Sequence, residues 1–281
     1  MIRKVRFLLI LSCLAVFLNA KAQFDDPKTL EIGPHGGVSY YMGDINPLKP
    51  FAMADWQYGG VVRFNYNNRW TFRADYSYVT VKADDKIIKW RPERELNFMS
   101  KIHDVSFVAE FNFLEYYTGN PKKNVSPYIF GGISVFYYTV FTQVGDSLIN
   151  LSDHKTEPVP TDAKWYERAF GKTSPVGISI PFGIGVKFAL SRHAAATVEW
   201  RMQKTFTNYL DDVATVYPAI NQRPVVEIDG ELYDLSDPTT TFEEGQQRGN
   251  SAFNDWFGMA RVSLTWKFNL PDGRGCNLSK F

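Results

Sequence analysis

Cysteine is nearly absent from this chain of 281 residues, which contains only two, at positions 13 and 276. Cys13 lies in an N-terminal segment that we expect to be cleaved off, so a single thiol remains. One cysteine cannot form an internal disulfide, so the fold must be held together by other means. Cys276 lies in a short C-terminal tail, residues 269–281, as a free thiol or as a site that pairs with a partner's cysteine.

Long apolar runs and an excess of charge are missing as well. Beyond the N-terminal leader, no segment approaches the roughly 18 consecutive apolar residues of a membrane-spanning helix. Only helices and closed barrels satisfy their backbone hydrogen bonds in lipid, so a membrane form of this chain would be a β-barrel. The 31 basic and 30 acidic residues nearly cancel, and we expect no nucleic-acid partner.

The N-terminus has the features of a secretory signal peptide. Three basic residues precede an apolar run at 7–18, and an Ala-Lys-Ala sequence at 20–22 supplies a cleavage site. A lipoprotein signal using Cys13 is the alternative, although the apolar stretch before it is very short. We expect residues 1–22 to be removed, leaving 27 basic and 30 acidic residues and a net charge of −3 in a single domain, residues 23–281.

Residues 252–268 carry the clearest structural signal, because from Met259 onward polar and apolar residues alternate strictly. Successive side chains of a strand point to opposite faces, so one face is apolar and the other polar. Aromatic residues flank the apolar face, as Trp256 and Phe257 at one end and as Trp266 and Phe268 at the other. This pattern is typical of a lipid-facing strand with a polar lumen face.

Similar alternation recurs along the chain and predicts about eight strands. Long loops at about 83–100, 145–174 and 210–251 separate strands that are otherwise joined by short turns. Within the loops, Gly145-Asp146 and Asp229-Gly230 are hairpin signals. The predicted strands are residues 30–44, 55–67, 69–82, 101–115, 127–144, 175–189, 194–209 and 252–268.

An even strand number with alternating long loops and short turns is typical of outer-membrane barrels. We therefore predict an all-β fold, an eight-stranded antiparallel transmembrane β-barrel of the outer membrane with both termini in the periplasm. A secreted soluble β-sandwich is the alternative, but it does not require outward faces that are so uniformly apolar.

The polar faces predict a set of inward charges of nearly balanced sign. An eight-stranded barrel is just wide enough for side chains to fill it, and an enclosed charge is costly unless it is paired. We expect a salt-bridge network that plugs the lumen; a catalytic or transport role for the same residues is the alternative. The predicted lumen residues are Glu31, Arg63, Arg73, Asp75, Asp104, Glu110, Lys187, Glu199, Arg201, Arg261 and Lys267.

Two further sets of residues follow from the barrel prediction. The lipid-facing aromatic girdle is predicted to comprise Phe72, Tyr76, Phe107, Phe111, Phe182, Trp200, Trp266 and Phe268. Possible docking points for a periplasmic partner are Lys122, Lys123, Arg192, His193 and Cys276, although the basic pairs could equally be solvated turns.

Signals for catalysis, metals or cofactors are weak. The four histidines show no metal-ligand spacing, and His103 and Asp104 point to opposite faces of a strand. A Gly-Lys-Thr triplet at 171–173 lacks the first glycine of a phosphate-binding loop. The acidic loop 210–251 could bind calcium, but a solvated external loop is the simpler interpretation. We expect no catalytic residue, cofactor, metal or small-molecule substrate.

The first strand and its exit resemble the PorG family, small outer-membrane barrels of the type IX secretion system. The resemblance rests on Glu31-Ile32-Gly33, on the segment from Ser39 to Pro47, and on Gly59-Gly60 in the second strand. It implies a non-enzymatic role in association with a periplasmic lipoprotein ring of the PorK–PorN type. It identifies no contact residues individually.

We therefore expect a subunit that anchors or docks a secretion apparatus at the outer membrane. The alternative is an OmpX- or OmpW-like barrel whose external loops bind a ligand or surface. A barrel enzyme would require an acid/base constellation at its rim, which the sequence does not provide.

Overall fold

The computed structural model describes residues 28–154, 156–158 and 174–270. The predicted signal peptide, the Gly-Lys-Thr triplet at 171–173 and Cys276 lie outside this part of the chain. Within it, no helix is both long and apolar enough to cross a membrane.

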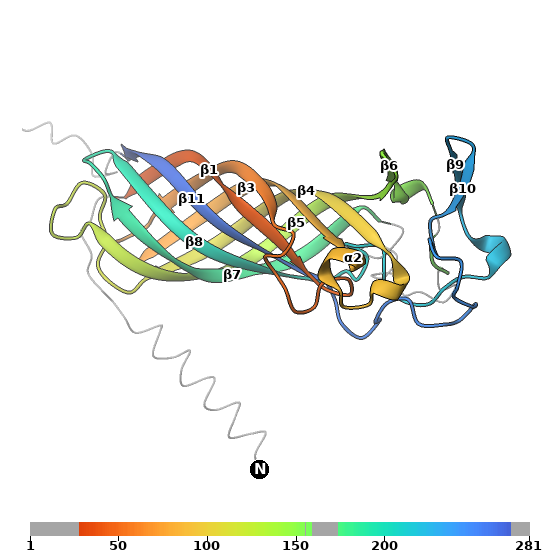
Figure 1. Cartoon of the computed structure of the whole chain (residues 1–281). Coiled ribbons are helices and arrows are strands. Elements are labelled where there is room, and N and C mark those ends of the chain that lie inside the picture. Colours follow the sequence, from red (N-terminus) through yellow and green to blue (C-terminus); the bar gives the residue numbers. More distant parts are fainter. Residues whose placement is uncertain (1–27, 155, 159–173, 271–281) are drawn as a thin grey trace, which may run out of the picture.

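Eight long antiparallel strands form a closed barrel (Figure 1). Each strand pairs with its neighbours in the order β4-β3-β2-β1-β11-β8-β7-β5, and β4–β5 pairing closes the ring. This confirms the predicted fold class. The barrel strands are β1 (Thr29–Met42), β2 (Asp55–Asn65), β3 (Trp70–Asp84), β4 (Asn97–Asn112), β5 (Val125–Val144), β7 (Val176–Ala189), β8 (Ala194–Thr205) and β11 (Trp256–Asn269).

The strand register sets the width and the tilt of the barrel. Starting at Trp70 of β3, a row of directly opposed residues runs through β4, β5, β7, β8 and β11 to Val38 of β1. It continues to Trp56 of β2, one position past the Gln57–Val79 pair, and so returns to β3 at Thr80, ten residues beyond Trp70. Such a stagger requires strands tilted by about 40°, with an interior that side chains can fill.

Long loops gather at one end of the barrel and short turns at the other (Figure 1). Both ends of the described chain lie at the short-turn end, where the Leu270 N–H donates to the Lys28 carbonyl at 3.2 Å. The long-loop end carries α2 (Asp85–Ile88), the 3-10 turns η1 (Pro92–Arg94), η2 (Leu151–Asp153) and η3 (Ile220–Gln222), and the short strands β6 (Ser147–Asn150), β9 (Val225–Ile228) and β10 (Glu231–Asp234).

The loop predictions are partly confirmed. Gly145, at a φ of +58°, turns the β5–β6 hairpin, and Asp229-Gly230 turns the β9–β10 hairpin. The prediction of a loop over 83–100 was too long, because β3 extends to Asp84 and β4 begins at Asn97. These strand ends pair with each other above the part of the wall that the sequence pattern marked as lipid-facing.

The reason for that misjudged boundary is an inversion of patterning along the strands. In β3, outward positions up to Tyr78 are apolar or aromatic, and inward ones are polar. Beyond Tyr78 the two faces exchange character. The outward residues there are Thr80, Lys82 and Asp84, and the inward residues are Val79, Val81 and Ala83, all three buried. The apolar outer belt therefore ends near Tyr78.

Candidate functional site: a barrel closed along its length

The lower lumen, toward the short-turn end, holds the charged residues predicted from the sequence. The structure places all of them inside the barrel. Each side chain is buried: Glu31, Arg63, Arg73, Asp75, Asp104, Glu110, Lys187, Glu199, Arg201, Arg261 and Lys267.

Arg73 lies at the centre of this network and contacts three carboxylates. Its guanidinium nitrogens lie 2.8 Å from Asp75, 2.6 Å from Glu110 and 2.5 Å from Glu199. Arg261 bridges two of the same carboxylates, at 2.8 Å from both Asp75 and Glu199. Asp75 and Glu199 are thus each shared between Arg73 and Arg261, which compensates the cost of burying them.

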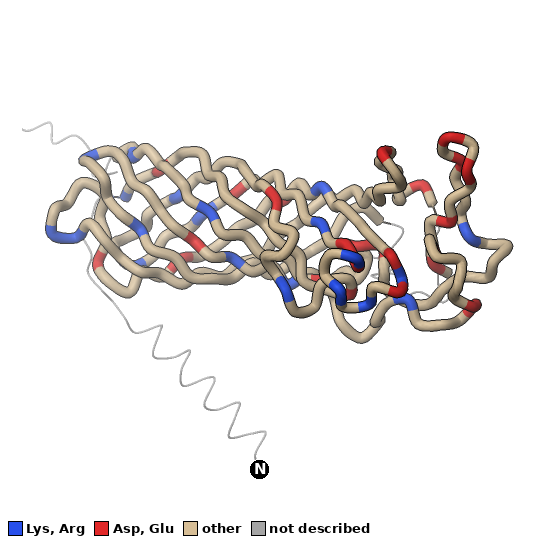
Figure 2. Tube along the Cα trace, in the orientation of Figure 1, with Lys and Arg blue, Asp and Glu red and all other residues tan. Residues whose placement is uncertain are grey.

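The network extends in both directions along the barrel axis. Toward the short turns, the Lys187 ammonium lies 2.5 Å from Glu110, and Arg63 lies 3.4 Å from the same carboxylate. Toward the long loops, Arg201 reaches Asp104 at 3.4 Å and Asp75 at 3.5 Å. Figure 2 shows basic and acidic residues interspersed along the barrel strands among uncharged residues.

Tyr128 is a member of the network that sequence reasoning missed. Its hydroxyl donates to Glu199 at 2.7 Å, and the Lys187 ammonium lies 4.9 Å from its ring centroid. Strand β5 is dense in tyrosine and phenylalanine, so its inward face could not be recognised by polarity. Its pairing with Gly185, where a Cβ would lie 2.6 Å from the Tyr128 ring, shows why this large side chain fits inward.

The short-turn end of the lumen is closed by the β4–β5 turn. Tyr116 and Thr118 are buried there, and the Thr118 hydroxyl donates to Glu31 at 2.6 Å. Lys267 donates to the Thr118 carbonyl, and Lys187 lies over the Tyr116 ring at 5.7 Å. The sequence predicted a connecting turn here, with Lys122 and Lys123 as possible docking points. The polar contacts of Thr118 with the lumen charges fold this turn into the opening.

The long-loop end is closed by apolar packing. Above the charged lumen, inward residues of five strands, β1, β3, β4, β5 and β11, pack with residues of the loops into one core, which we call the cap core. It comprises Tyr41, Ile45, Val79, Val81, Ala83, Ile88, Leu96, Phe98, Ile102, Phe136, Tyr138, Val140, Leu151, Leu210, Val213, Leu235, Phe257 and Met259.

Polar contacts tie the loops to the cap core. Asn46 donates to the carbonyls of Tyr41 and Lys49, and Arg94 pairs with Asp85 at 2.7 Å. Arg248 pairs with Glu157 at 2.9 Å. The segment from Ser39 to Pro47, which carried the family resemblance, contacts two of the loops, since Arg94 donates to the Asp44 carbonyl at 3.2 Å and the Asn250 N–H donates to the Asp44 carboxylate at 2.8 Å.

The interpretation of residues 210–251 as a solvated loop was right only in part, because Glu227, Asp229, Glu231, Glu243 and Glu244 are exposed but other acidic residues are not. Asp211, Asp212 and Asp237 are buried, and Arg223 donates to Asp237 at 3.0 Å. The number of charges is evident from the sequence, but the packing of the loop on the cap core is not. Among the described residues, no group of three or more His, Cys, Asp or Glu side chains is arranged to hold a metal ion.

Burial shifts the titration of three cap carboxyls. It raises the pKa of Asp255 from 3.8 to about 8 and that of Asp44 to about 6. The pKa of Asp211 lies well above its ordinary range, first because of burial and then because Asp255 and Asp44 lie nearby. Each of these carboxyls is stabilised in its protonated form.

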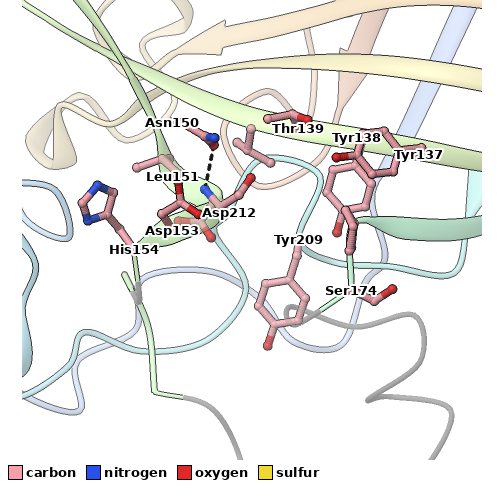
Figure 3. Close-up of a pocket in the computed structure, with 13 residues that line it drawn as sticks. Tyr137, Tyr138, Thr139, Asn150, Leu151, Asp153, His154, Ser174, Tyr209 and Asp212 are labelled. Carbon is pink, nitrogen blue, oxygen red and sulfur yellow. Dashed lines mark hydrogen bonds between the residues drawn. The ribbon is translucent and has the colours of Figure 1, made fainter.

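A pocket of about 400 Å³ opens on the side of the cap, between β5, η2 and the loop after β8. Figure 3 shows the Tyr138 and Tyr209 rings on one side and Asn150, Asp153 and His154 on the other. The pocket also borders Ser174, where the described chain resumes, so we assign it no ligand.

The predicted girdle residues all face outward and are exposed or half-buried. Trp266 and Phe268 lie at the short-turn end, where the His193 ring stacks on Trp266 at 5.9 Å. Tyr76 lies toward the other end, with its hydroxyl 2.9 Å from His103 Nδ1. Between them on the outer wall lie Phe72, Phe107, Phe111, Phe182 and Trp200.

Four of the five predicted docking residues lie on adjoining turns, and we call them the turn platform: Lys122, Lys123, Arg192 and His193. A Cβ on Gly119 would lie 2.8 Å from the Arg192 carbonyl oxygen, so the β4–β5 and β7–β8 turns are in close contact. Lys123 pairs with Glu115 at 2.8 Å, and Lys122 and Arg192 are exposed.

These features define an eight-stranded transmembrane β-barrel whose lumen is filled by charges and whose ends are closed by a turn and a cap. A family model described as "Domain of unknown function (DUF6089)" matches residues 5–160. The match covers more than half of the chain, and the chain belongs to this family. No curated protein matches it.

Several solved outer-membrane barrels are similar at low identity. Neisserial surface protein A has 10% identity and a TM-score of 0.42, over 85% of this chain and 97% of that one. Pseudomonas aeruginosa OprG has 11% identity and a TM-score of 0.40, over 88% and 99%. The N-terminal barrel of Pseudomonas aeruginosa OprF has 12% identity and a TM-score of 0.37, over 85% and 97%.

Proposed function

We propose that this protein is a non-enzymatic, non-conducting barrel of the outer membrane that anchors or docks a protein-secretion apparatus from the periplasmic side. The observation that carries the proposal is the closure of the lumen by the Arg73 network, the β4–β5 turn and the cap core. A filled barrel has only its two ends as working surfaces. In an outer membrane the short-turn end is the periplasmic one.

The turn platform supports a docking role for that end. Exposed or half-buried basic residues there are Lys28, Arg69, Lys122, Lys123 and Arg192, while Glu115 is the acidic residue beside them. A positive surface of this kind favours association with an acidic partner surface. A PorK- and PorN-like lipoprotein ring is the partner that the family resemblance implies, with outer-membrane lipids around the barrel wall.

The runner-up function is binding of an external ligand or surface by the cap, as in OmpX- or OmpW-like barrels. The packed cap core and its buried Arg94–Asp85 and Arg248–Glu157 pairs favour this role, because they hold the loops in one arrangement. A rigid loop surface loses less conformational entropy when it binds.

Affinity purification from mild-detergent outer membranes tests the proposal. Tagged wild type should recover ring lipoproteins, and a Lys122→Glu, Arg192→Glu variant should lose most of them. The matched control is Lys86→Glu, Lys89→Glu, which reverses two exposed cations at the opposite end. If wild type recovers no periplasmic lipoprotein, the docking proposal is wrong and external binding by the cap becomes the leading function.

A further inference from the structure

The outer wall of β2–β5 is hollowed within the apolar belt. A groove of about 490 Å³ runs over Ala74, Ala109 and Gly131, with Phe72 and Phe107 as walls. It forms because the register places Phe72 opposite Ala109 and Ala109 opposite Gly131, so that small residues adjoin on one face. A Cβ on Gly131 would have no heavy atom within 4 Å, so the groove is open to the outside.

The groove lies within the lipid-facing surface and is surrounded by its apolar residues. Its other outward lining residues are also apolar, and two of the lining side chains stand well out from the surface: Phe107 is 61% exposed and Ile133 is 65% exposed. An occupant that reaches this depth from the bilayer must itself be apolar and narrow. A lipid acyl chain has these properties.

A polar constellation lies above the groove on the same strands. Lys101 is flanked on its row by Thr80 and Thr139, its direct partners on β3 and β5. The Lys101 ammonium lies 5.0 Å from the Phe141 ring centroid, which holds the side chain against the wall. A cation between two hydroxyls offers the donors that a phosphate accepts.

The row beneath Lys101 marks the edge of the apolar belt. It consists of Tyr78, His103 and Tyr137, which are directly opposed across β3, β4 and β5. The His103 ring packs edge-on against Tyr78 at 5.0 Å. Aromatic residues with polar tips are typical of the membrane–water interface, so Lys101 lies at headgroup level.

The spacing between the two features fits one leaflet. Tyr137 and Gly131 are six residues apart on β5, about 20 Å along the strand. A tilt of about 40° reduces this to a depth of about 15 Å. Half of a hydrocarbon core of about 30 Å is the same distance.

We propose that the β2–β5 wall is a binding site for one anionic lipid of the outer leaflet. Its acyl chain lies along the groove and its phosphate is held by Lys101, Thr80 and Thr139. Lys82, which pairs with Asp55 at 2.8 Å, lies near the same headgroup and is not needed for the contact. The inference rests on the outer-membrane location proposed above, because the outer leaflet supplies the lipid.

Native mass spectrometry of the detergent-purified protein with added bisphosphorylated lipid A tests this site. Wild type should retain one lipid. Lys101→Gln should lower the retained fraction roughly tenfold, the effect of losing one charge-assisted hydrogen bond. Gly131→Leu should have a similar effect by filling the groove, and the open space there lets the variant fold.

Two controls make the result decisive. Lys204→Gln removes an outward cation that lies over Trp256 on the β8–β11 wall, away from the groove, and should leave lipid retention unchanged. Dephosphorylated lipid should be retained as weakly by wild type as the phosphorylated form is by Lys101→Gln. Heat-dependent gel migration checks that each variant is folded.

Equal lipid retention by wild type, Lys101→Gln and Gly131→Leu would overturn the site. Dimers of the wild-type protein that are lost in Gly131→Leu would also overturn it, because a second copy of the chain would then occupy the groove. Equal retention of phosphorylated and dephosphorylated lipid would overturn the anionic assignment. Membrane fractionation tests the location separately: protein absent from outer membranes would refute the proposed function, while the binding measurement in detergent would still report on the site.

Discussion

Tyr41 and Asp255 are joined by a hydrogen bond that links the end of β1 to the residue before β11, with 2.7 Å between the phenol oxygen and Asp255 Oδ1. The same hydroxyl lies 2.5 Å from Asp211 Oδ2. A tyrosine has one proton to donate, so it cannot satisfy two carboxylates at once. One of the two carboxyls therefore carries a proton of its own.

This shared proton predicts that alkaline conditions loosen the cap. The pKa of Asp255 is raised from 3.8 to about 8, so the folded cap binds more protons than the unfolded chain between these values. Its stability is then greatest below about pH 4 and falls as the pH rises toward 8. Amide hydrogen exchange of residues 207–215 between pH 5 and 9 should show increasing opening.

Several other titratable groups lie near Tyr41 and Asp255, so the control must remove the titration of Asp255 alone. Asp44 and Asp211 face Asp255, and Tyr138 and Asp212 lie nearby. Arg94, Glu157 and Arg91 lie near Asp44. Asp255→Asn keeps the shape but removes the titration, so its opening equilibrium, taken from exchange rates relative to the intrinsic rate at each pH, should depend much less on pH. An unchanged pH dependence in this variant would show that the shared proton does not control the cap.

Removal of Arg73 should be strongly destabilising. Arg73→Ala leaves Asp75, Glu110 and Glu199 buried with fewer cations, which costs about 3–5 kcal/mol. Denaturant unfolding in detergent micelles measures the change. The matched control is Arg91→Ala, whose pair with Glu93 is largely exposed and should contribute no more than about 1 kcal/mol. Similar losses in both variants would argue against a lumen network that bears on stability.

A larger side chain at position 119 should separate the two turns of the platform. Gly119 has a φ of +95°, and a Cβ there would lie 2.8 Å from the Arg192 carbonyl oxygen. Gly119→Val should increase trypsin cleavage at Lys122 and Arg192 several-fold, since both contact and backbone conformation are lost. Gly145→Val is a control with a positive φ but no nearby atoms, and it should leave this cleavage unchanged.

The filled lumen predicts that the protein does not conduct. Liposomes that contain the purified barrel should remain as tight to potassium and chloride as protein-free liposomes. The reason is that buried side chains occupy the axis from Thr118 to Phe257. Stable single-channel steps in planar bilayers would contradict this closed structure.

The barrel could be predicted from sequence because its signals are local. Strict alternation in β11, for instance, identifies the lumen face of Arg261 and Lys267 without knowledge of any other strand. Hairpins were equally accessible, since Asp229-Gly230 needs only its own turn geometry. Contacts between neighbouring strands are also accessible, because side chains on one face of a strand recur every two residues and meet those on the same face of its partner.

The cap could not be predicted, because its contacts join residues that are far apart in the chain. Tyr41 meets Asp211 across a sequence separation of 170 residues and Asp255 across 214. A count of acidic residues in 210–251 suggested solvent exposure, whereas packing on the cap core buries Asp211, Asp212 and Asp237. Thr118 was missed for the same reason, since its partner Glu31 lies 87 residues away.

The change of the outward face of β3 from apolar to polar beyond Tyr78 also fixes how deeply the barrel sits in the membrane. If the barrel sank by two residues, Thr80, Lys101 and Thr139 would enter hydrocarbon; if it rose, Tyr78 and Tyr137 would leave the interface. Either displacement is therefore unfavourable, because the boundary between apolar and polar outward residues lies at the same level on β3, β4 and β5. The protein thus holds a fixed position along the membrane normal. A partner at the short-turn end or a ligand at the cap therefore meets it at a constant distance from the membrane surface.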